Sequence, residues 1–215
     1  MSELKALDGI GERIIAYLDG KNAARDLALQ RSRTMIRHCA TAIRAAHRDE
    51  SDLSQEHLDQ ARQIKEALSE ELEAYPDLFH AGYTQDAFKE YAEASIVNAL
   101  FAGEPLPDPD ELNIEYAAYL GGLGEATGEL RRRTLDILRS NQSGEAERLL
   151  QMMDEIYGLL VTVDFPDAIT GKLRRLTDVV RGIVERTRGD LTTSLRQDDL
   201  KSALQAMQDR LSEES

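Results

Sequence analysis

Two pairs of glutamates have the spacing that metal or acid–base chemistry would need. Glu90 and Glu93 are three residues apart and Glu125 and Glu129 are four apart, so on helices each pair shares one face. If the two helices pack antiparallel, four carboxylates converge, and such a group must share protons or bind cations. Oxygen ligands suit hard cations, which predicts Mg²⁺ or Mn²⁺. The alternative is that each pair lies on a solvated helix face.

The glycines around the second pair indicate a close helix contact. The stretch from Gly121 to Arg133 reads G-G-L-G-E-A-T-G-E-L-R-R-R. Each of its four glycines costs about 1 kcal/mol relative to Ala in a helix interior. The sequence therefore predicts that another backbone lies close to this segment.

Helical periodicity runs through the whole chain, and no stretch alternates long enough to predict a strand. We expect an opening segment broken by glycines at 9, 11 and 20, a long helix to Arg48 and a second helix to about Tyr75. The third and fourth helices carry the glutamate pairs, and the fourth ends near 140–144. A fifth helix (146–163), a sixth that starts at Pro166 and a polar helix near 200–211 follow.

Two segments bear on how the helices assemble. The run E-P-L-P-D-P-D-E, Glu104 to Glu111, predicts a loop short enough to join neighbouring antiparallel helices. The sixth helix has an apolar seam that fits an internal core or an oligomer contact equally well. Its members are Ile169, Leu173, Leu176, Val180 and Ile183.

The charge of the chain is strongly negative but unevenly distributed. The formal net charge is -14, yet Lys21 to Arg48 hold seven basic residues and one acidic residue. A basic helix in an acidic protein favours anion binding, with a solvated outer face as the alternative. A second basic cluster begins just after Glu129. The expected nucleic-acid contacts are Arg33, Arg37, Arg44 and Arg48, which form one stripe, together with Arg132 and Arg133.

Size and composition predict a single helical domain over residues 1–215, with about 20 peripheral residues at each end. Only six of the 26 basic residues are Lys, a composition that resembles proteins of salt-loving cytoplasms. There is no apolar run of membrane length and no signal-like start, so we expect a cytoplasmic protein with no membrane partner. The single Cys39 excludes an internal disulfide.

Most catalytic motifs are missing. The sequence has no Walker loop, dinucleotide fingerprint, zinc spacing or Glu-x-x-His repeat. Asp77-x-x-His80 has ligand-like spacing, but it follows Pro76 at a helix junction, which predicts a turn. Any catalysis must therefore come from carboxylates.

The acidic motifs resemble those of the translin family, specifically its catalytic branch, translin-associated factor X (TRAX). E-Y-A-E-A, Glu90 to Ala94, is close to the E-Y-V-E-A of that branch. Y-L-G-G-L-G-E-A-T-G-E-L, Tyr119 to Leu130, resembles its Y-L-L-G-V-A-D-L-T-G-E-L. Weaker matches lie in the first long helix and in the sixth, so the resemblance covers roughly residues 20–190.

The resemblance implies an all-α protomer of about seven helices that assembles into a hollow, usually octameric, homo-oligomeric shell. In the catalytic branch such shells cut single-stranded RNA with a divalent metal, whereas translin itself mainly binds single strands of RNA or DNA. The metal-binding acids of the family fall on Glu90, Glu93, Glu125 and Glu129, with Glu125 where the family usually has Asp. Three functions follow: a metal-dependent endoribonuclease, a catalytically silent single-strand-binding shell, or a purely structural helical oligomer.

Overall fold

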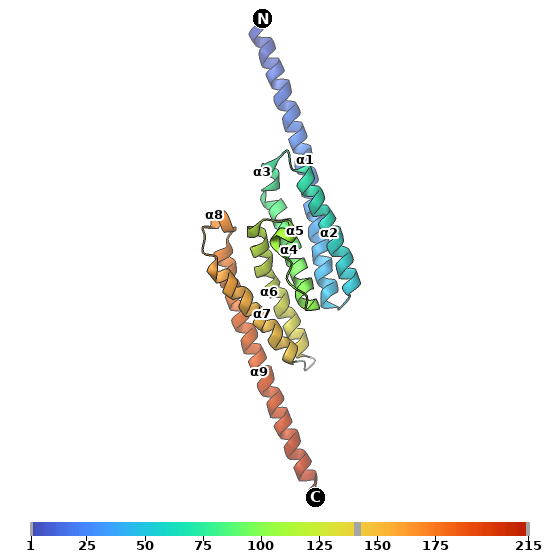
Figure 1. The fold of residues 1–215 in the computed structure, drawn as a ribbon, viewed down its shortest axis with the longest axis vertical. Coiled ribbons are helices and arrows are strands. Elements are labelled where there is room, and N and C mark those ends of the chain that lie inside the picture. Colours follow the sequence, from blue (N-terminus) through green and yellow to red (C-terminus); the bar gives the residue numbers. More distant parts are fainter. Residues whose placement is uncertain (1, 140–142, 214–215) are drawn as a thin grey trace. The chain divides into compact units, whose positions relative to one another are not determined.

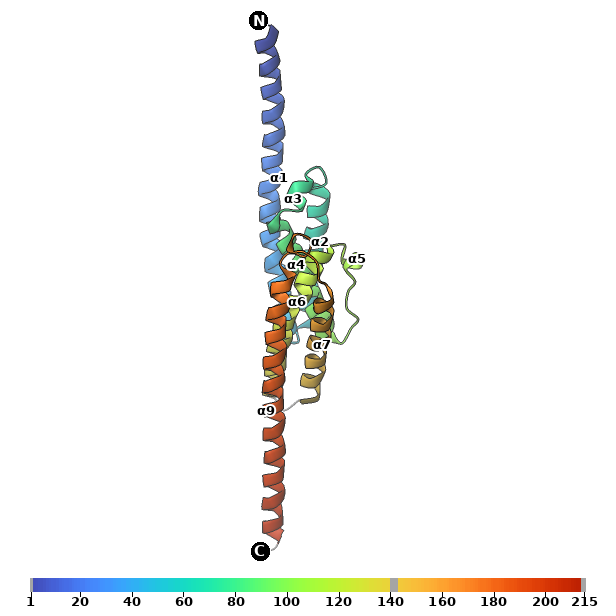
Figure 2. The same ribbon diagram turned by 90° about the vertical axis from the view of Figure 1, so that its left-hand side faces the viewer.

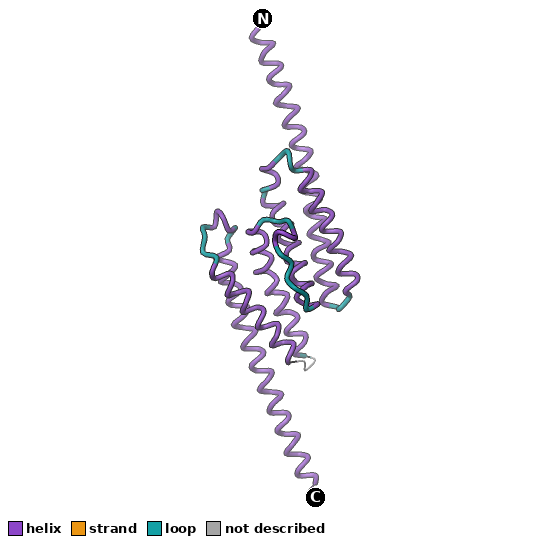
Figure 3. Tube along the Cα trace, viewed as in Figure 1, coloured by secondary structure: helices purple, strands orange, loops and turns teal. Residues whose placement is uncertain are grey.

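A computed structural model describes residues 2–139 and 143–213 of the chain, and within these ranges all regular structure is helical (Figure 3), which confirms the all-α class. Six long helices carry the fold: α1 (Ser2–His47), α2 (Ser51–Glu71), α4 (Gly82–Ala102), α6 (Tyr116–Leu138), α7 (Ser143–Thr162) and α9 (Leu173–Glu213). Three single-turn helices lie between them (Figure 1): α3 (Pro76–Phe79), α5 (Pro109–Leu112) and α8 (Asp167–Thr170). In the described ranges no helix is long and apolar enough to cross a membrane.

Contacts along the chain divide it into two compact units, residues 1–122 and 123–215. In the first unit α1 packs against α2 and α4, and α2 also contacts α4. In the second unit α7 and α8 pack against α9. Helix α6 runs without a break through the division at Gly122. The single-domain organisation of residues 1–215 stays a prediction.

The core of the first unit is formed by one face each of α1, α2 and α4. Met35, Leu68 and Phe88 are fully buried there. The buried stripe of α2 follows a helical period and consists of Ser54, Leu58, Ala61, Lys65 and Leu68. Lys65 is only 3% exposed, and burial lowers the pKa of its ammonium group. A basic side chain therefore occupies a position that the periodicity assigns to an apolar one.

Helix α1 continues through the glycines that the sequence led us to treat as breaks. A Cβ added at Gly9 or Gly11 would meet no atom within 4 Å, so neither position is needed for a close contact. Each glycine costs about 1 kcal/mol, but extending an existing helix avoids the larger cost of starting a new one. The N-terminal part of α1 runs past the other helices of its unit (Figures 1 and 2). It exposes an apolar stripe of Leu7, Ile10, Ile14, Tyr17 and Leu18.

Helix α9 likewise joins two helices that we expected to be separate. Pro166 precedes only the single turn α8, after which Gly171 and Lys172 take positive φ values of 59° and 69° and lead into α9. Leu173 and Val180 of the predicted seam are buried, whereas Ile169 is 64% exposed. The buried part of the seam is thus internal core. Further along, α9 exposes Leu200, Leu204, Met207 and Leu211.

The remaining boundaries differ from expectation by about a turn. Helix α2 ends at Glu71, before Tyr75, and Pro76 begins α3. The predicted loop contains α5, whose start is stabilised by a capping box between Asp108 and Glu111. The predicted end of the fourth helix falls partly on residues 140–142, which lie outside the described residues.

Candidate metal centre and basic surfaces

Glu90 and Glu93 of α4 form a pair of converging carboxylates. An oxygen of one lies within 4.8 Å of an oxygen of the other. Glu93 is only 8% exposed, and the side chain of Glu90 is 27% exposed. A buried carboxylate is costly unless it is paired or binds a cation. Converging carboxylate oxygens are the ligands that hard divalent cations prefer, so the donor type fits Mg²⁺ or Mn²⁺.

Two other ionisable groups lie near Glu90 and Glu93: the ammonium group of Lys89 and the buried thiol of Cys39. The Nζ atom of Lys89 lies 3.5 Å from Oε1 of Glu90. Cys39 of α1 is fully buried. Burial, and then the charges of Glu90 and Glu93, raise the pKa of its thiol. The thiol therefore stays protonated at neutral pH and is neither a nucleophile nor a thiolate ligand.

The backbone of α6 comes very close to α4 beside this pair. A Cβ added at Gly122 would lie 2.7 Å from the Cβ of Ala92, the backbone nitrogen of Glu93 and the carbonyl oxygen of Lys89. Only glycine allows so close an approach. This confirms, at Gly122, the prediction that another backbone lies against the glycine-rich stretch.

Glu125 follows Gly122 by about one turn of the same unbroken helix, and Glu129 by about two. Both side chains are half-buried. Within the second unit, Nη1 of Arg132 lies 3.7 Å from Oε2 of Glu129. A Cβ at Gly124 would lie 2.5 Å from the side chain of Leu176, so within the second unit α6 also packs tightly against α9.

All four arginines of the predicted stripe are exposed: Arg33, Arg37 and Arg44 lie on α1, whereas Arg48 lies in the turn just after it. Two of them, Arg37 and Arg44, are seven residues apart and make the same kind of hydrogen bond. Arg37 donates a hydrogen bond of 2.9 Å to the hydroxyl of Thr34, and Arg44 donates one of 2.9 Å to Thr41. Each threonine in turn bonds to a carbonyl of the preceding turn. These contacts orient the guanidinium groups without neutralising them.

Arg48 differs from the other three because Glu50 neutralises it. Its Nε and Nη2 atoms donate hydrogen bonds of 2.9 and 2.7 Å to the two carboxylate oxygens of Glu50. Among the residues that the structure describes, Arg33, Arg37 and Arg44 form no ion pair with a carboxylate. These three keep their full charge for an anionic ligand.

The second basic cluster lines a groove of about 410 Å³ in the second unit. Its lining residues are Gly128, Arg131, Arg132, Leu135, Asp136 and Arg139. Arg133 is not among them. The pKa of Glu145 is lowered mainly by a hydrogen bond from Arg148, and the charge of Arg133 adds to this effect. Arg139 is not among the predicted contacts, although its spacing of seven residues from Arg132 places both on one helix face.

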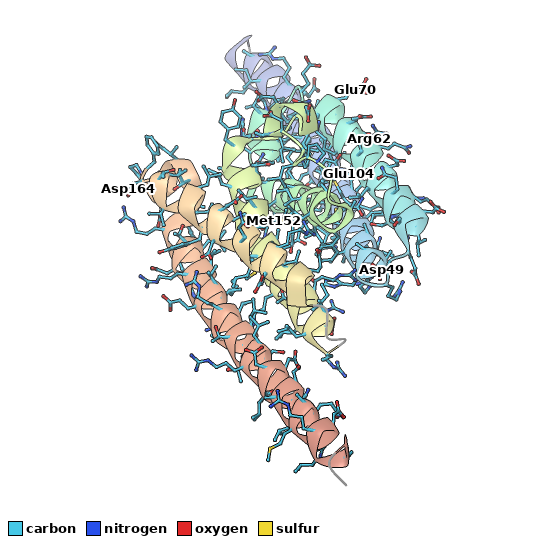
Figure 4. The ribbon with its side chains drawn as sticks, turned by 60° about the horizontal axis from the view of Figure 1, so that its bottom comes forward. Asp49, Arg62, Glu70, Glu104, Met152 and Asp164 are labelled. Atoms are coloured by element: carbon cyan, nitrogen blue, oxygen red, sulfur yellow. The ribbon has the colours of Figure 1, made fainter. Side chains whose placement is uncertain are left out.

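Two other polar features lie away from the glutamate pair. Asp77 pairs with Lys21 at 2.6 Å and His80 with Glu115 at 2.9 Å, so the Asp77-x-x-His80 spacing forms no common site. A polar pocket of about 220 Å³ lies between α2, α4 and the following loop. Its lining includes Tyr91, Asn98, and the Arg62 and Glu104 side chains labelled in Figure 4.

Comparison with known proteins identifies the family. No protein-family model matches the chain. The uncharacterized protein MJ0175 of Methanocaldococcus jannaschii is 32% identical over 204 residues, which are 94% of this chain and 90% of that protein. The crystal structure of AfC3PO is 31% identical with a TM-score of 0.80, covering 86% of this chain and 97% of that chain. The chain belongs to the translin (C3PO) family.

Two further structures extend the comparison. A complex of AfC3PO with duplex RNA matches with 30% identity and a TM-score of 0.76, over 86% of this chain and 96% of that chain. Apo-NeC3PO matches with 21% identity and a TM-score of 0.77, over 87% and 96% of the two chains, and shows the likeness of the fold alone. The translin-family membership and fold predicted from the acidic motifs are thereby confirmed.

Proposed function

We propose that this translin-family protein is a metal-dependent endoribonuclease of the TRAX type that cleaves single-stranded RNA inside a homo-oligomeric shell. The observation that carries the proposal is Glu93, a buried carboxylate beside Glu90 at the point where Gly122 meets the α4 backbone. A merely structural bundle would gain stability from an apolar residue there. Membership in a family whose AfC3PO member is known in complex with duplex RNA supports the RNA binding that this function requires.

Glu90, Glu93, Glu125 and Glu129 would hold Mg²⁺ or Mn²⁺ in this proposal. When bound, such an ion neutralises charge on a phosphodiester and lowers the pKa of water. The oxygen ligands would come from α4 and α6, and the contact of Gly122 with the α4 backbone supports this pairing of helices.

The exposed arginines provide the attraction for RNA that the carboxylates lack. Arg33, Arg37 and Arg44 line α1 with free guanidinium groups, and Arg132 lines the groove on α6. Arg133 would add to the attraction for RNA phosphates. Arg48 would contribute less, because Glu50 neutralises its guanidinium group. Lys- and Arg-phosphate contacts dominate such binding and make it salt-dependent.

The direct test is a cleavage assay with Glu93→Gln, which removes a charge and preserves the shape. We expect cleavage of single-stranded RNA with Mg²⁺ or Mn²⁺ to fall by more than the roughly 10–100-fold that loss of an outer-shell partner costs. RNA binding should persist. Asp86→Asn, an exposed residue of the same helix, is the matched control and should cut normally. Duplex RNA belongs in the assay because AfC3PO forms a complex with it.

A catalytically silent RNA-binding shell is the second candidate, and Glu125 is the observation that favours it. Glu125 is one methylene longer than the Asp usual at this position of the family motif. If the parent never cuts RNA with either metal, at low or high salt, while Glu125→Asp does, the shell hypothesis holds for the natural chain. Equal cleavage by the parent and by Glu93→Gln would instead refute the assignment of the site. High salt is included because the acidic composition suggests a salt-loving origin.

The RNA path is tested by the salt dependence of binding. The double variant Arg37→Ala/Arg44→Ala removes two phosphate contacts and should flatten the slope of log K against log salt by about 1.4 for a single strand. Arg48→Ala is the control, because Glu50 already neutralises that guanidinium. An unchanged slope in the double variant would show that RNA follows another face.

Assembly into a shell is supported by the apolar stripes that α1 and α9 expose. We propose a homo-oligomer, an octamer by family resemblance, in the cytoplasm. Light scattering measures the mass directly. A stable 24.0 kDa particle at working salt would refute assembly.

A further inference from the structure

Two histidines face each other across the α1–α2 contact of the first unit. His38 lies on α1 and His57 on α2, both half-buried. Their Nδ1 atoms are 2.9 Å apart and their ring centroids 5.1 Å apart. At this distance one Nδ1 carries a proton and the other accepts it, because two protonated nitrogens would repel. Neither Glu90 nor Glu93 belongs to this pair, which therefore lies outside the proposed catalytic site.

The pair offers neutral nitrogen donors. Burial, followed by the charges of His57 and Arg37, lowers the pKa of His38. Neutral imidazole is the form that binds metal, and it suits Cu²⁺, Ni²⁺ and Zn²⁺ better than Mg²⁺. The spacing also fits the square-planar geometry of Cu²⁺ or Ni²⁺, in which two neighbouring nitrogen ligands at about 2.0–2.1 Å from the metal lie about 2.9 Å apart.

The surroundings leave room for the other ligands of an ion. A pocket of about 290 Å³ beside His38 is lined by Gln60, Gln63 and Ile64 as well as Arg31. The glutamines carry amide oxygens, and the pocket admits water. The nearby cations are engaged elsewhere, since Arg31 pairs with Glu71 and Arg37 bonds to Thr34.

We propose that His38 and His57 form a site for a transition-metal ion such as Cu²⁺, Ni²⁺ or Zn²⁺ that clamps α1 to α2. Both Nδ1 atoms donate their lone pairs to the ion. The proton that one Nδ1 carried moves through solvent to Nε2 of the same ring, so no net proton is released. The site is distinct in ligand chemistry from the carboxylates that would bind Mg²⁺ or Mn²⁺.

Electron paramagnetic resonance with Cu²⁺ tests the ligands directly. One equivalent of Cu²⁺ on the full chain should show hyperfine coupling to two imidazole nitrogens. His38→Gln and His57→Gln should each lose that signal and bind Cu²⁺ at least tenfold more weakly. His80→Gln, which alters an exposed histidine paired with Glu115, should retain both. An all-oxygen spectrum in the parent, or an unchanged one in His57→Gln, would overturn the proposal.

Thermal unfolding with Ni²⁺ provides a second measurement, which is independent of the Cu²⁺ spectra. Bridging α1 and α2 should raise the melting temperature of the parent and of Glu93→Gln, but not that of His57→Gln. Circular dichroism checks that each variant is folded. A shift equal in the parent and His57→Gln would mean that only surface carboxylates bind the ion. RNA cleavage with Mg²⁺ is measured separately, so failure of this site and failure of the nuclease proposal are distinguishable.

Discussion

Replacing Gly122 by Ala tests the helix contact on which the candidate metal centre depends. The new methyl group adds about 1 kcal/mol of helix propensity. It would also lie 2.7 Å from three atoms of α4, two of which belong to the backbone. No side-chain rotation relieves such a clash, so α6 must move away, and overpacking of this kind costs about 1–3 kcal/mol. With the cost at its upper end, we expect a net loss of about 1–2 kcal/mol, which for a chain of this length lowers the melting temperature by about 2–8 °C.

Gly128→Ala on the same helix is the matched control. A Cβ there meets no atom within 4 Å, so the variant should gain up to about 1 kcal/mol from helix propensity. Urea unfolding followed by circular dichroism measures both changes, and the free energy of unfolding should fall only in Gly122→Ala. If Gly122→Ala proved as stable as Gly128→Ala, the close approach of α6 to the Glu93 backbone would be refuted.

Two further predictions concern charged groups. Lys65→Met should raise the free energy of unfolding by about 1–3 kcal/mol in urea titrations, because burial disfavours the ammonium and methionine keeps the volume; a loss of stability would show that the lysine has a structural partner. A hydrogen bond from Arg148 lowers the pKa of Glu145, so this pair stabilises the fold above the ordinary glutamate pKa of about 4.3, and the contribution is lost as the pH falls through the lowered value. Glu145→Gln should therefore flatten the fall of the urea midpoint between pH 6 and pH 3, and an unchanged acid profile would contradict this.

The sequence predicts the helical class and the close contact at Gly122 because both depend on local residue patterns. A period of 3.6 residues survives any tertiary arrangement, and a buried glycine with no turn to make implies a neighbour. The ends of the helices are harder to predict from sequence. Gly9 and Gly11 cost too little to stop a helix that is stabilised further along, so α1 continues where a break was expected.

Contacts between helices are what the sequence cannot supply. His38 meets His57 because of the register of α1 against α2, and no local pattern encodes that register. The pairing of Arg48 with Glu50 is local instead: α1 ends at His47, and the turn that follows brings the two side chains together. It leaves three arginines of the predicted stripe without a carboxylate partner. The roles of the four glutamates stay predictions until metal binding is measured.

Cys39 gives the molecule a natural reporter of its own fluctuations. The thiol is fully buried, its pKa is raised, and it is the single cysteine of the chain. Alkylating reagents attack thiolates, so modification must wait for a local opening that exposes Cys39 to solvent. The rate of labelling then gives the frequency of opening behind Glu90 and Glu93. A divalent ion bound by those carboxylates should slow that rate, so the rate of Cys39 alkylation reports metal occupancy without any engineered residue.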